Sequence, residues 1–297
     1  MRPNSPSATL LLGLTTLSLL ATLLLVRFNA SSLPPPREYS PENRFEFCES
    51  NAHRHLTQLA KVIGPRPTGS AANYQHAISY IVGVVRQLQR EIDTQRAEHN
   101  LNQTAVAACR LRLDFEVQSV EGVHLWDDAV ALSYANISNV LVRLSPTTTS
   151  TPDAPPTPTL LVSSHLDSAI GSPGAGDDGV AVASMLETLR VLVHRSCAAP
   201  SLLARNLLKF RHPTIFLFNN AEEMGLLGAH GFARSNHRWM QANKGEIGAF
   251  INLEGAGTRG KAMLFQTGPG NAWIADMYAA SVPYPRGTVM VRHVWSS

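Results

Sequence analysis

The stretch TLLVSSHLDS at residues 159–168, followed by SPGAGDDG at residues 172–179, decides the fold. Residues 159–163 form a short apolar run rich in β-formers, which predicts a buried strand. His165 and Asp167 follow where this strand ends, and their side chains point the same way because strand side chains alternate between two faces. An imidazole and a carboxylate are therefore expected side by side at the end of a strand.

The Gly/Pro-rich turn that follows leads into an amphipathic helix, which we expect over residues 180–193. Asp177 and Asp178 lie at the start of this helix, where Asp178 is better explained as a helix cap than as a ligand. Open α/β sheets bind ligands at the carboxyl ends of their parallel strands. Histidine and carboxylates without thiolates are typical of an open, catalytic zinc site.

Three more apolar runs predict buried strands at residues 214–219, 248–253 and 262–266, and a helix is expected to begin near residue 221 and run to about Arg234. Alternating apolar strands and helices predict an α/β fold with a mostly parallel sheet and helices on both faces. Nearer the N-terminus we expect two helices and a pair of strands, at residues 51–63, 73–91, 110–120 and 137–144.

Acidic side chains also end the next two strands: Glu222 and Glu223 follow one of them, and Glu254 follows the other. Short turns in a parallel sheet would bring these side chains to the same edge as His165. Carboxylates gathered in this way repel one another unless cations neutralise them. Two zinc ions about 3.5–4 Å apart need several carboxylates and histidines. Adjacent glutamates suit a division of labour, in which one binds metal and the other takes a proton from metal-bound water.

Six motifs occur in order over roughly residues 50–275: GPRPTGS (64–70), HLDS (165–168), SPGAGDDG (172–179), FLFNNAEE (216–223), FINLEGAG (250–257) and LFQTGPGNAW (264–273). Together they resemble the co-catalytic zinc aminopeptidase family, and most closely its endoplasmic reticulum metallopeptidase branch. The resemblance implies a zinc-dependent metallopeptidase that holds two Zn²⁺ ions in the complete domain. Its substrate would be a peptide, hydrolysed by metal-activated water, with a preference for a free N-terminus.

The resemblance also implies a role for each matching residue. His165 would bind one zinc ion, Asp177 would bridge both, Glu223 would be a ligand of one ion and Glu254 a ligand of the other. Glu222 would be the general base, and Asp167 would orient His165 from behind, as zinc-bound histidines usually require. His230, further along the helix after Glu223, is better explained as a packing or surface residue.

The family has one more histidine ligand in a later segment. The only histidine after Glu254 is His293, in a tail at residues 291–297 that resembles no family motif, and we give it little weight as a substitute. We therefore expect a C-terminally truncated chain, in which residues 45–290 form a peptidase domain that is incomplete at its C-terminus.

Residues 8–26, after a short tail at residues 1–7, carry no charge and are long enough to cross a bilayer. We favour an uncleaved signal anchor over a cleaved signal peptide or a buried core helix. Residues 27–44 then form a Pro-rich spacer that includes Pro34-Pro35-Pro36.

The orientation signals in the sequence conflict. Arginines are more numerous after the span than before it, which alone would place the following domain in the cytoplasm. Three glycosylation sequons follow the span, at Asn29, Asn102 and Asn136. We give the sequons more weight and expect the endoplasmic reticulum membrane, with the peptidase domain in the lumen.

Composition excludes some classes of protein. The 297 residues are 44% hydrophobic with a net charge of +3 and no basic run, so nucleic-acid binding has no support. The three cysteines leave two readings open, one disulfide with a free thiol or three buried thiols. Residues 145–158 form a low-complexity loop. Nothing in the sequence indicates the oligomeric state.

Two other functions compete with the peptidase. One is a catalytically inactive peptidase-like protein that acts as a binding or membrane-complex component. The other, which we rank low, is glutaminyl-cyclase-like chemistry with a single zinc. Retained zinc together with hydrolysis would distinguish the peptidase from the inactive protein.

Overall fold

The computed structural model describes residues 7–31, 33–102, 109, 111–126, 130–147, 157–197, 212–239, 247–255 and 261–287. The chain divides into two compact units, Pro36–Thr258 and a smaller one made of Met1–Pro35 with Arg259–Ser297. His293 and the tail at residues 291–297 lie outside the described residues.

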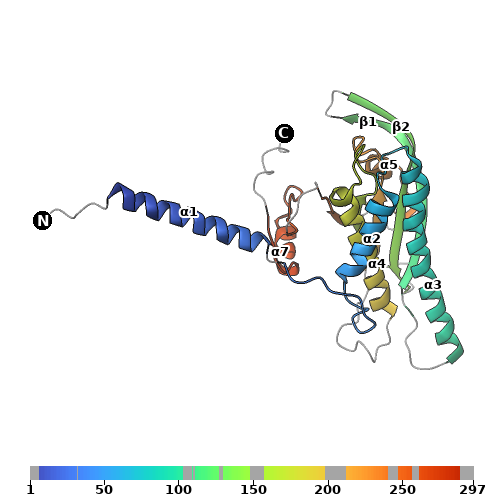
Figure 1. Ribbon diagram of the computed structural model, residues 1–297. Helices are drawn as coiled ribbons and strands as arrows, with labels where there is room; N and C mark the ends of the chain where they lie inside the picture. Colours follow the sequence, from blue (N-terminus) through green and yellow to red (C-terminus); the bar gives the residue numbers. More distant parts are fainter. Residues whose placement is uncertain are drawn as a thin grey trace. The chain divides into compact units, whose positions relative to one another are not determined.

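The larger unit is built on a five-stranded sheet with the order β1-β2-β4-β3-β5 (Figure 1). Its strands are β1 (Leu111–Trp126), β2 (Val130–Pro146), β3 (Thr159–His165), β4 (Thr214–Asn219) and β5 (Ile247–Asn252). β3 pairs in parallel with both β4 and β5, whereas β1–β2 and β2–β4 are antiparallel. The sheet is therefore mixed, not mostly parallel as predicted. Its parallel part is the part that carries the predicted site, and β1 and β2 add a long hairpin at one edge.

Helices cover both faces of this sheet, as predicted. The larger unit contains α2 (Glu49–Thr57), the π-helical turns η1 (Gln58–Ile63), η2 (Ala72–Ala77) and η3 (Ala175–Gly179), and the helices α3 (Ile78–Asn102), α4 (Val180–Cys197) and α5 (Leu227–Arg234). Alternate residues of β4 show the two cores: Phe216 and Phe218 pack with α3 and α4, while Ile215 and Leu217 pack on the other side with Phe232 of α5. The α/β fold class is confirmed.

Several predicted boundaries differ from those in the structure. The paired strands β1 and β2 are longer than predicted, and α3 continues to Asn102. The predicted helix near residue 221 begins only at Leu227, after a series of turns in which Ala221 and Leu226 adopt positive φ angles of 57° and 60°. Residues in this conformation cannot continue a right-handed helix. Glu222 and Glu223 consequently lie in a loop rather than in the first turn of a helix.

Residues that follow the Pro-rich segment are packed on the larger unit. The Arg37 amide donates to Glu49 Oε2 at 2.9 Å, and the Cys48 amide donates to the buried Glu187 of α4 at 2.9 Å. Arg190 of α4 pairs with Glu187 at 2.6 Å and also donates to main-chain carbonyls of the segment. Part of the predicted spacer therefore belongs to the folded unit.

A disulfide joins Cys109, just before β1, to Cys197, the last residue of α4, and Cys48 is free and buried. The structure thus selects one of the two readings that the sequence left open.

The smaller unit contains α1 (Ala8–Ser31) and α7 (Ala272–Ser281). Residues Ala8–Phe28 of α1 are long and apolar enough to cross a membrane, by length and composition. The predicted strand at residues 262–266 is absent from the described part of this unit, where Leu264 makes only an isolated bridge to Gly287. Apolar side chains here, such as Phe265 and Trp273, are exposed, so no described core holds residues 262–266 in an extended strand.

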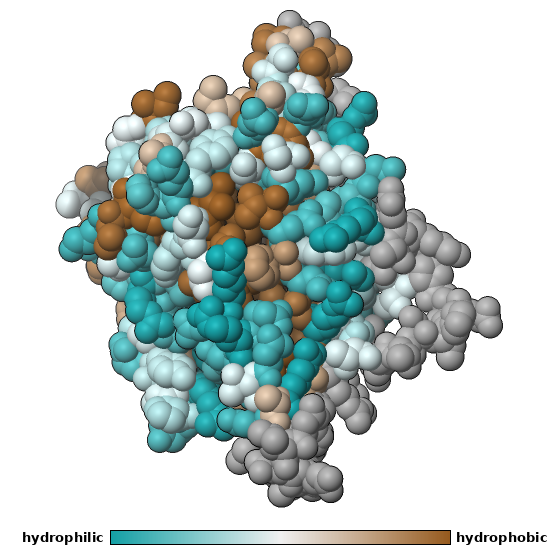
Figure 2. Space-filling model, turned by 90° about the vertical axis from the view of Figure 1, so that its right-hand side faces the viewer, coloured by the Kyte–Doolittle hydropathy of each residue, from teal (hydrophilic) through white to brown (hydrophobic). Residues whose placement is uncertain are grey.

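The face drawn in Figure 2 is hydrophilic over most of its area, with hydrophobic side chains gathered near its centre. Apolar groups are common on protein surfaces, and this face alone does not indicate an interface.

His55 of α2 makes folding stability depend on pH. The His55 ring is buried, and its Nδ1 lies 2.6 Å from the Tyr80 hydroxyl of α3. Burial and the neighbouring Arg54 lower the pKa of His55 to about 4. In the unfolded chain the ring binds a proton near pH 6.5, so the unfolded state gains more protons as the pH falls. We expect the free energy of unfolding to drop by about 3 kcal/mol between pH 6.5 and pH 4 from this group, and to stay level above pH 7.

Urea unfolding of the detergent-solubilised chain across this pH range measures the effect. In His55→Gln, the free energy of unfolding should depend less on pH than in the wild type. His53→Gln changes an exposed position of the same helix and should leave this pH dependence unchanged. Equal slopes in all three proteins would contradict the prediction.

Candidate metal centre

The predicted site residues come from four segments that meet at one edge of the sheet. His165 is the last residue of β3, Asp177 lies in η3, Glu222 follows β4, and Glu254 follows β5. Because β4, β3 and β5 are parallel neighbours, their carboxyl ends lie at the same edge. This edge is where the sequence predicted the site.

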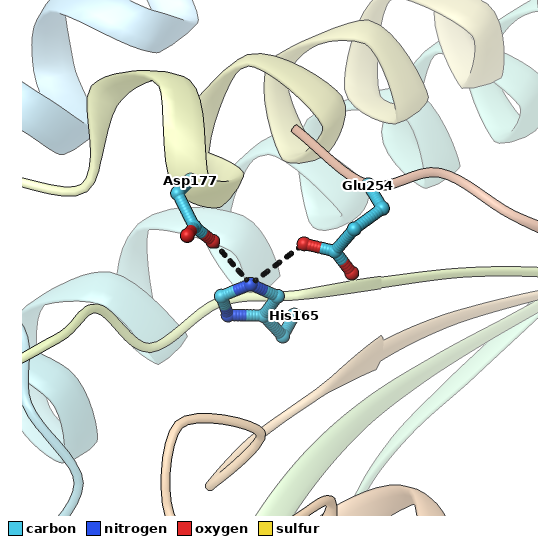
Figure 3. A group of neighbouring side chains, drawn as sticks. All are labelled: His165, Asp177 and Glu254. Atoms are coloured by element: carbon cyan, nitrogen blue, oxygen red, sulfur yellow. Dashed lines mark hydrogen bonds and ion pairs between the residues drawn. The ribbon is translucent and has the colours of Figure 1, made fainter. Parts of the chain in front are cut away.

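Two carboxylates, those of Asp177 and Glu254, converge on one ring nitrogen of His165 (Figure 3). His165 Nε2 lies 2.9 Å from Asp177 Oδ1 and 3.4 Å from Glu254 Oε1. The three donor atoms all lie within 4.8 Å of one another, a grouping that could hold a metal ion. Glu222 Oε2 is 3.9 Å from the same nitrogen. His165 itself is 1% exposed, so its orientation is fixed by the protein around it.

Asp167 connects the histidine to the loop that carries the glutamates. Its Oδ1 lies 3.4 Å from His165 Nδ1, on the side of the ring away from Asp177. Its two oxygens also accept hydrogen bonds from the main-chain amides of Glu222 and Glu223, both at 3.2 Å, and from Thr68 Oγ1 at 3.2 Å. The sequence predicted the contact with His165 but not the hydrogen bonds to the loop. This single buried carboxylate therefore positions two parts of the site.

Glu223, like Glu222, lies outside the group formed by His165, Asp177 and Glu254. Its Oε1 is buried and has no hydrogen-bond partner among the described residues, and the same is true of Asp178 Oδ1. Buried polar atoms are usually paired, and an unpaired carboxylate oxygen is a place where a cation can bind. Both oxygens fit a site that is completed by metal.

Asp178 is not the helix cap that we expected. It is fully buried, and its Oδ2 accepts a hydrogen bond from Ser164 Oγ at 2.5 Å. Burial, together with the neighbouring carboxylates of Glu254 and Asp177, raises the pKa of Asp178 to about 8. The side chain turns into the sheet edge because Ser164 presents its hydroxyl there.

The electrostatics of the site reflect many carboxylates in a small volume. Burial, together with the carboxylates of Glu254 and Asp167 and against the opposing effect of His165, raises the pKa of Glu222 to about 7. Burial alone would lower the pKa of His165, but Asp167 and Glu254 raise it to about 11. Without metal, His165 therefore holds a proton and is the local cation. A metal ion that binds this ring must displace the proton.

Two glycines allow the segments of the site to approach closely. A Cβ atom on Gly255 would lie 2.2 Å from the carbonyl oxygen of Gly176, so the chain after Glu254 meets the loop before Asp177 backbone to backbone. Gly174 has a φ of 56°, and a Cβ atom there would lie 2.5 Å from Ser168 Cβ. Larger residues at either position would push the metal-binding segments apart.

A buried pair of amides supports the loop that carries the glutamates. Asn73 and Asn220 donate to each other's side-chain oxygens at 2.9 and 2.8 Å, and both are fully buried. Asn220 immediately precedes Ala221 and Glu222, so the pair fixes the start of the loop to η2. No role for these residues was predicted from the sequence, where the available signal was a pair of adjacent asparagines at the end of a strand.

The donor set fits zinc. One imidazole nitrogen and several carboxylate oxygens, with an orphaned carboxylate oxygen nearby, are ligands that catalytic zinc uses. A parallel sheet edge that carries such a cluster is a candidate metal centre of an α/β protein.

The comparison with known families makes this class specific. The model of peptidase family M28 matches residues 139–296, and the chain belongs to this family. The match includes all the metal-site candidates, and membership implies zinc.

Individual relatives agree with this assignment. The chain is 33% identical to endoplasmic reticulum metallopeptidase 1 of Rattus norvegicus over 95% of this chain and 27% of that protein. It is 39% identical to a vacuolar membrane protease of Candida albicans over 46% of this chain and 13% of that protein. The chain spans about a quarter of the length of the endoplasmic reticulum relatives it matches. Among solved structures, the zinc aminopeptidase BSAP from Bacillus subtilis shares the fold, with a TM-score of 0.51 and 14% identity over 82% of this chain and 80% of that chain.

Proposed function

We propose that the chain is the peptidase part of a membrane-anchored, zinc-dependent metallopeptidase that acts on peptides with a free N-terminus. The observation that carries the proposal is the convergence of His165, Asp177 and Glu254 from three segments at one sheet edge, in a chain of family M28.

We assign two zinc ions to the complete site. His165 and Glu254 would hold one ion, Asp177 would bridge the two, and Glu223 would be a ligand of the other ion through its orphaned oxygen. When bound, zinc acidifies a water molecule and polarises the peptide carbonyl. Asp167 holds the His165 ring from the opposite side and keeps the Glu222–Glu223 main chain in place.

Glu222 is the proposed general base. Its carboxylate is partly exposed and lies beside the metal group without belonging to it, which leaves it free to accept a proton from water. The pKa of Glu222 is about 7. A general base is most effective when its pKa is close to the pH at which the enzyme works, so this value suits hydrolysis near neutral pH. After hydrolysis begins, the same carboxyl group can pass the proton to the leaving amine.

We place the peptidase domain in the lumen of the endoplasmic reticulum. One relative is named for that organelle and another for the vacuolar membrane, and α1 provides a candidate anchor. The Cys109–Cys197 disulfide supports the lumenal side because disulfides form in oxidising compartments and are rare in the cytosol.

Elemental analysis and hydrolysis together test the proposal. The detergent-solubilised full chain should contain zinc and cleave a peptide with a free N-terminus faster than its N-acetylated form. Removal of zinc by a chelator should abolish cleavage, and added zinc should restore it. Bound zinc without cleavage would favour the inactive binding protein, and a chain without zinc would overturn the proposed site.

A further inference from the structure

Arg66, in the turn between η1 and η2, has an unusual environment for an arginine. It is fully buried, and none of the carboxylates described in the structure forms a salt bridge with it. Its guanidinium instead lies within hydrogen-bond distance, 2.7–3.3 Å, of five main-chain carbonyl oxygens, those of Leu59, Gly64, Leu166, Pro173 and Gly174, and three of these share the two hydrogens of Nη1. A buried charge is costly unless such contacts compensate it.

Three of these carbonyls belong to the two segments that carry His165 and Asp177. Arg66 Nε donates at 2.8 Å to the carbonyl of Leu166, the residue between His165 and Asp167. Its Nη1 and Nη2 donate at 2.7 and 3.0 Å to Pro173 and Gly174, which open the loop that leads to Asp177. One planar group therefore spans the end of β3 and the beginning of this loop.

The main chain of Arg66 is held as tightly as its side chain. The Arg66 amide donates to Ser168 Oγ at 3.0 Å, and its carbonyl accepts from Asn73 Nδ2 at 3.0 Å. Asn73 in turn pairs with Asn220, at the start of the loop with Glu222 and Glu223. The contacts of Arg66 thus extend to all three segments around His165.

The charge of Arg66 also matters for the site. The cluster gathers the carboxyl groups of Asp167, Asp177, Asp178, Glu222, Glu223 and Glu254. Arginine is charged in proteins, so Arg66 supplies a cation that interacts electrostatically with Asp167 and Asp178.

We propose that Arg66 is a positioning residue of the metal centre: it sets the distance between His165 and Asp177 through the Leu166, Pro173 and Gly174 carbonyls. The inference rests on the proposed zinc site. Lysine cannot replace it, because an ammonium group has three donors on a single atom and cannot span five carbonyls. Supporting contacts of this kind typically change metal affinity by about 10–100-fold.

The test compares Arg66→Lys with Arg90→Lys, a matched change at an exposed position of α3, in the full chain. Zinc affinity is measured by competition with a chromophoric chelator, and ligand geometry by the visible spectrum of the cobalt-substituted protein. We expect the zinc Kd of Arg66→Lys to rise about 10–100-fold and its cobalt spectrum to change. Arg90→Lys should match the wild type in both measurements.

Two further variants keep the inference testable if Arg66→Lys folds poorly. Ser168→Ala removes one hydrogen bond to the Arg66 amide and should weaken zinc binding in the same direction, but less. Arg66→Ala should regain zinc affinity when millimolar guanidinium is added, an effect that a general loss of stability would not show.

Unchanged zinc affinity in Arg66→Lys, with a lower unfolding temperature, would make the residue merely structural and overturn the inference while the proposed function stands. Absence of zinc from the wild-type chain would overturn both.

Discussion

Replacing Glu222 by glutamine is expected to reduce peptide hydrolysis by about 10²–10⁴-fold while zinc stays bound. The amide has nearly the shape of the carboxylate but cannot accept the proton from metal-bound water. Since Glu222 lies outside the group formed by His165, Asp177 and Glu254, its loss should leave metal binding intact. The change should appear in kcat more than in KM, because the base acts in the transition state.

Two matched variants separate this effect from a loss of metal. Glu223→Gln should lower zinc content and activity together, because Glu223 is a proposed ligand with an orphaned buried oxygen. Glu121→Gln changes an exposed glutamate of β1 and should leave both unaltered. Steady-state kinetics and zinc analysis of the three proteins decide the matter, and a Glu222→Gln protein with wild-type kcat would remove Glu222 from the mechanism.

Loss of the Cys109–Cys197 disulfide is expected to lower the free energy of unfolding by about 4 kcal/mol. The two cysteines are 88 residues apart, so the bond removes much of the conformational freedom of the unfolded chain. It also ties the end of α4 to the start of β1, and both elements contribute to the core between the helices and the sheet. For a domain of this size the unfolding temperature should fall by about 10 °C.

Thermal unfolding of a Cys109→Ser/Cys197→Ser double variant measures this loss. Wild-type protein treated with a reductant should unfold at a similar temperature, since it lacks the same bond. Cys48→Ala provides the control for removing a buried thiol that forms no disulfide. A double variant as stable as the oxidised wild type would show that the disulfide contributes nothing to the folded state.

The local part of the fold was predictable from sequence. The apolar run at residues 214–219 coincides with β4, and the run at 159–163 extends by two residues to form β3. Placing His165, Glu222 and Glu254 at one edge followed from the rule that parallel strands end together. The rule worked because these residues follow the three strands that are in fact parallel.

What escaped prediction depends on contacts between distant segments. The alternation of apolar and polar residues along a strand indicates which side chains are buried, but not which strand lies beside it. The antiparallel pairing of β2 with β4 could therefore not be predicted from the sequence. The late start of α5 arises from the positive φ of Leu226, a conformation that the residue type does not favour. The hydrogen bonds of Asp167 to the Glu222 and Glu223 amides join residues 55 and 56 positions apart. Three of the carbonyls that Arg66 contacts lie 100–108 positions away. All these contacts use main-chain groups, for which the sequence carries no direct signal.

The single-sided pairing of β5 has a consequence for metal exchange. Among the described strands, β3 is paired on both sides, whereas β5 is paired only with β3, and its side chains are mostly exposed. Segments with few buried contacts open locally without unfolding the rest. Glu254 therefore belongs to the part of the proposed site that opens most easily, while His165 stays in place. Detachment of β5 from β3 would therefore release an ion at the same time. Bound zinc would in turn stabilise the pairing of β5 with β3.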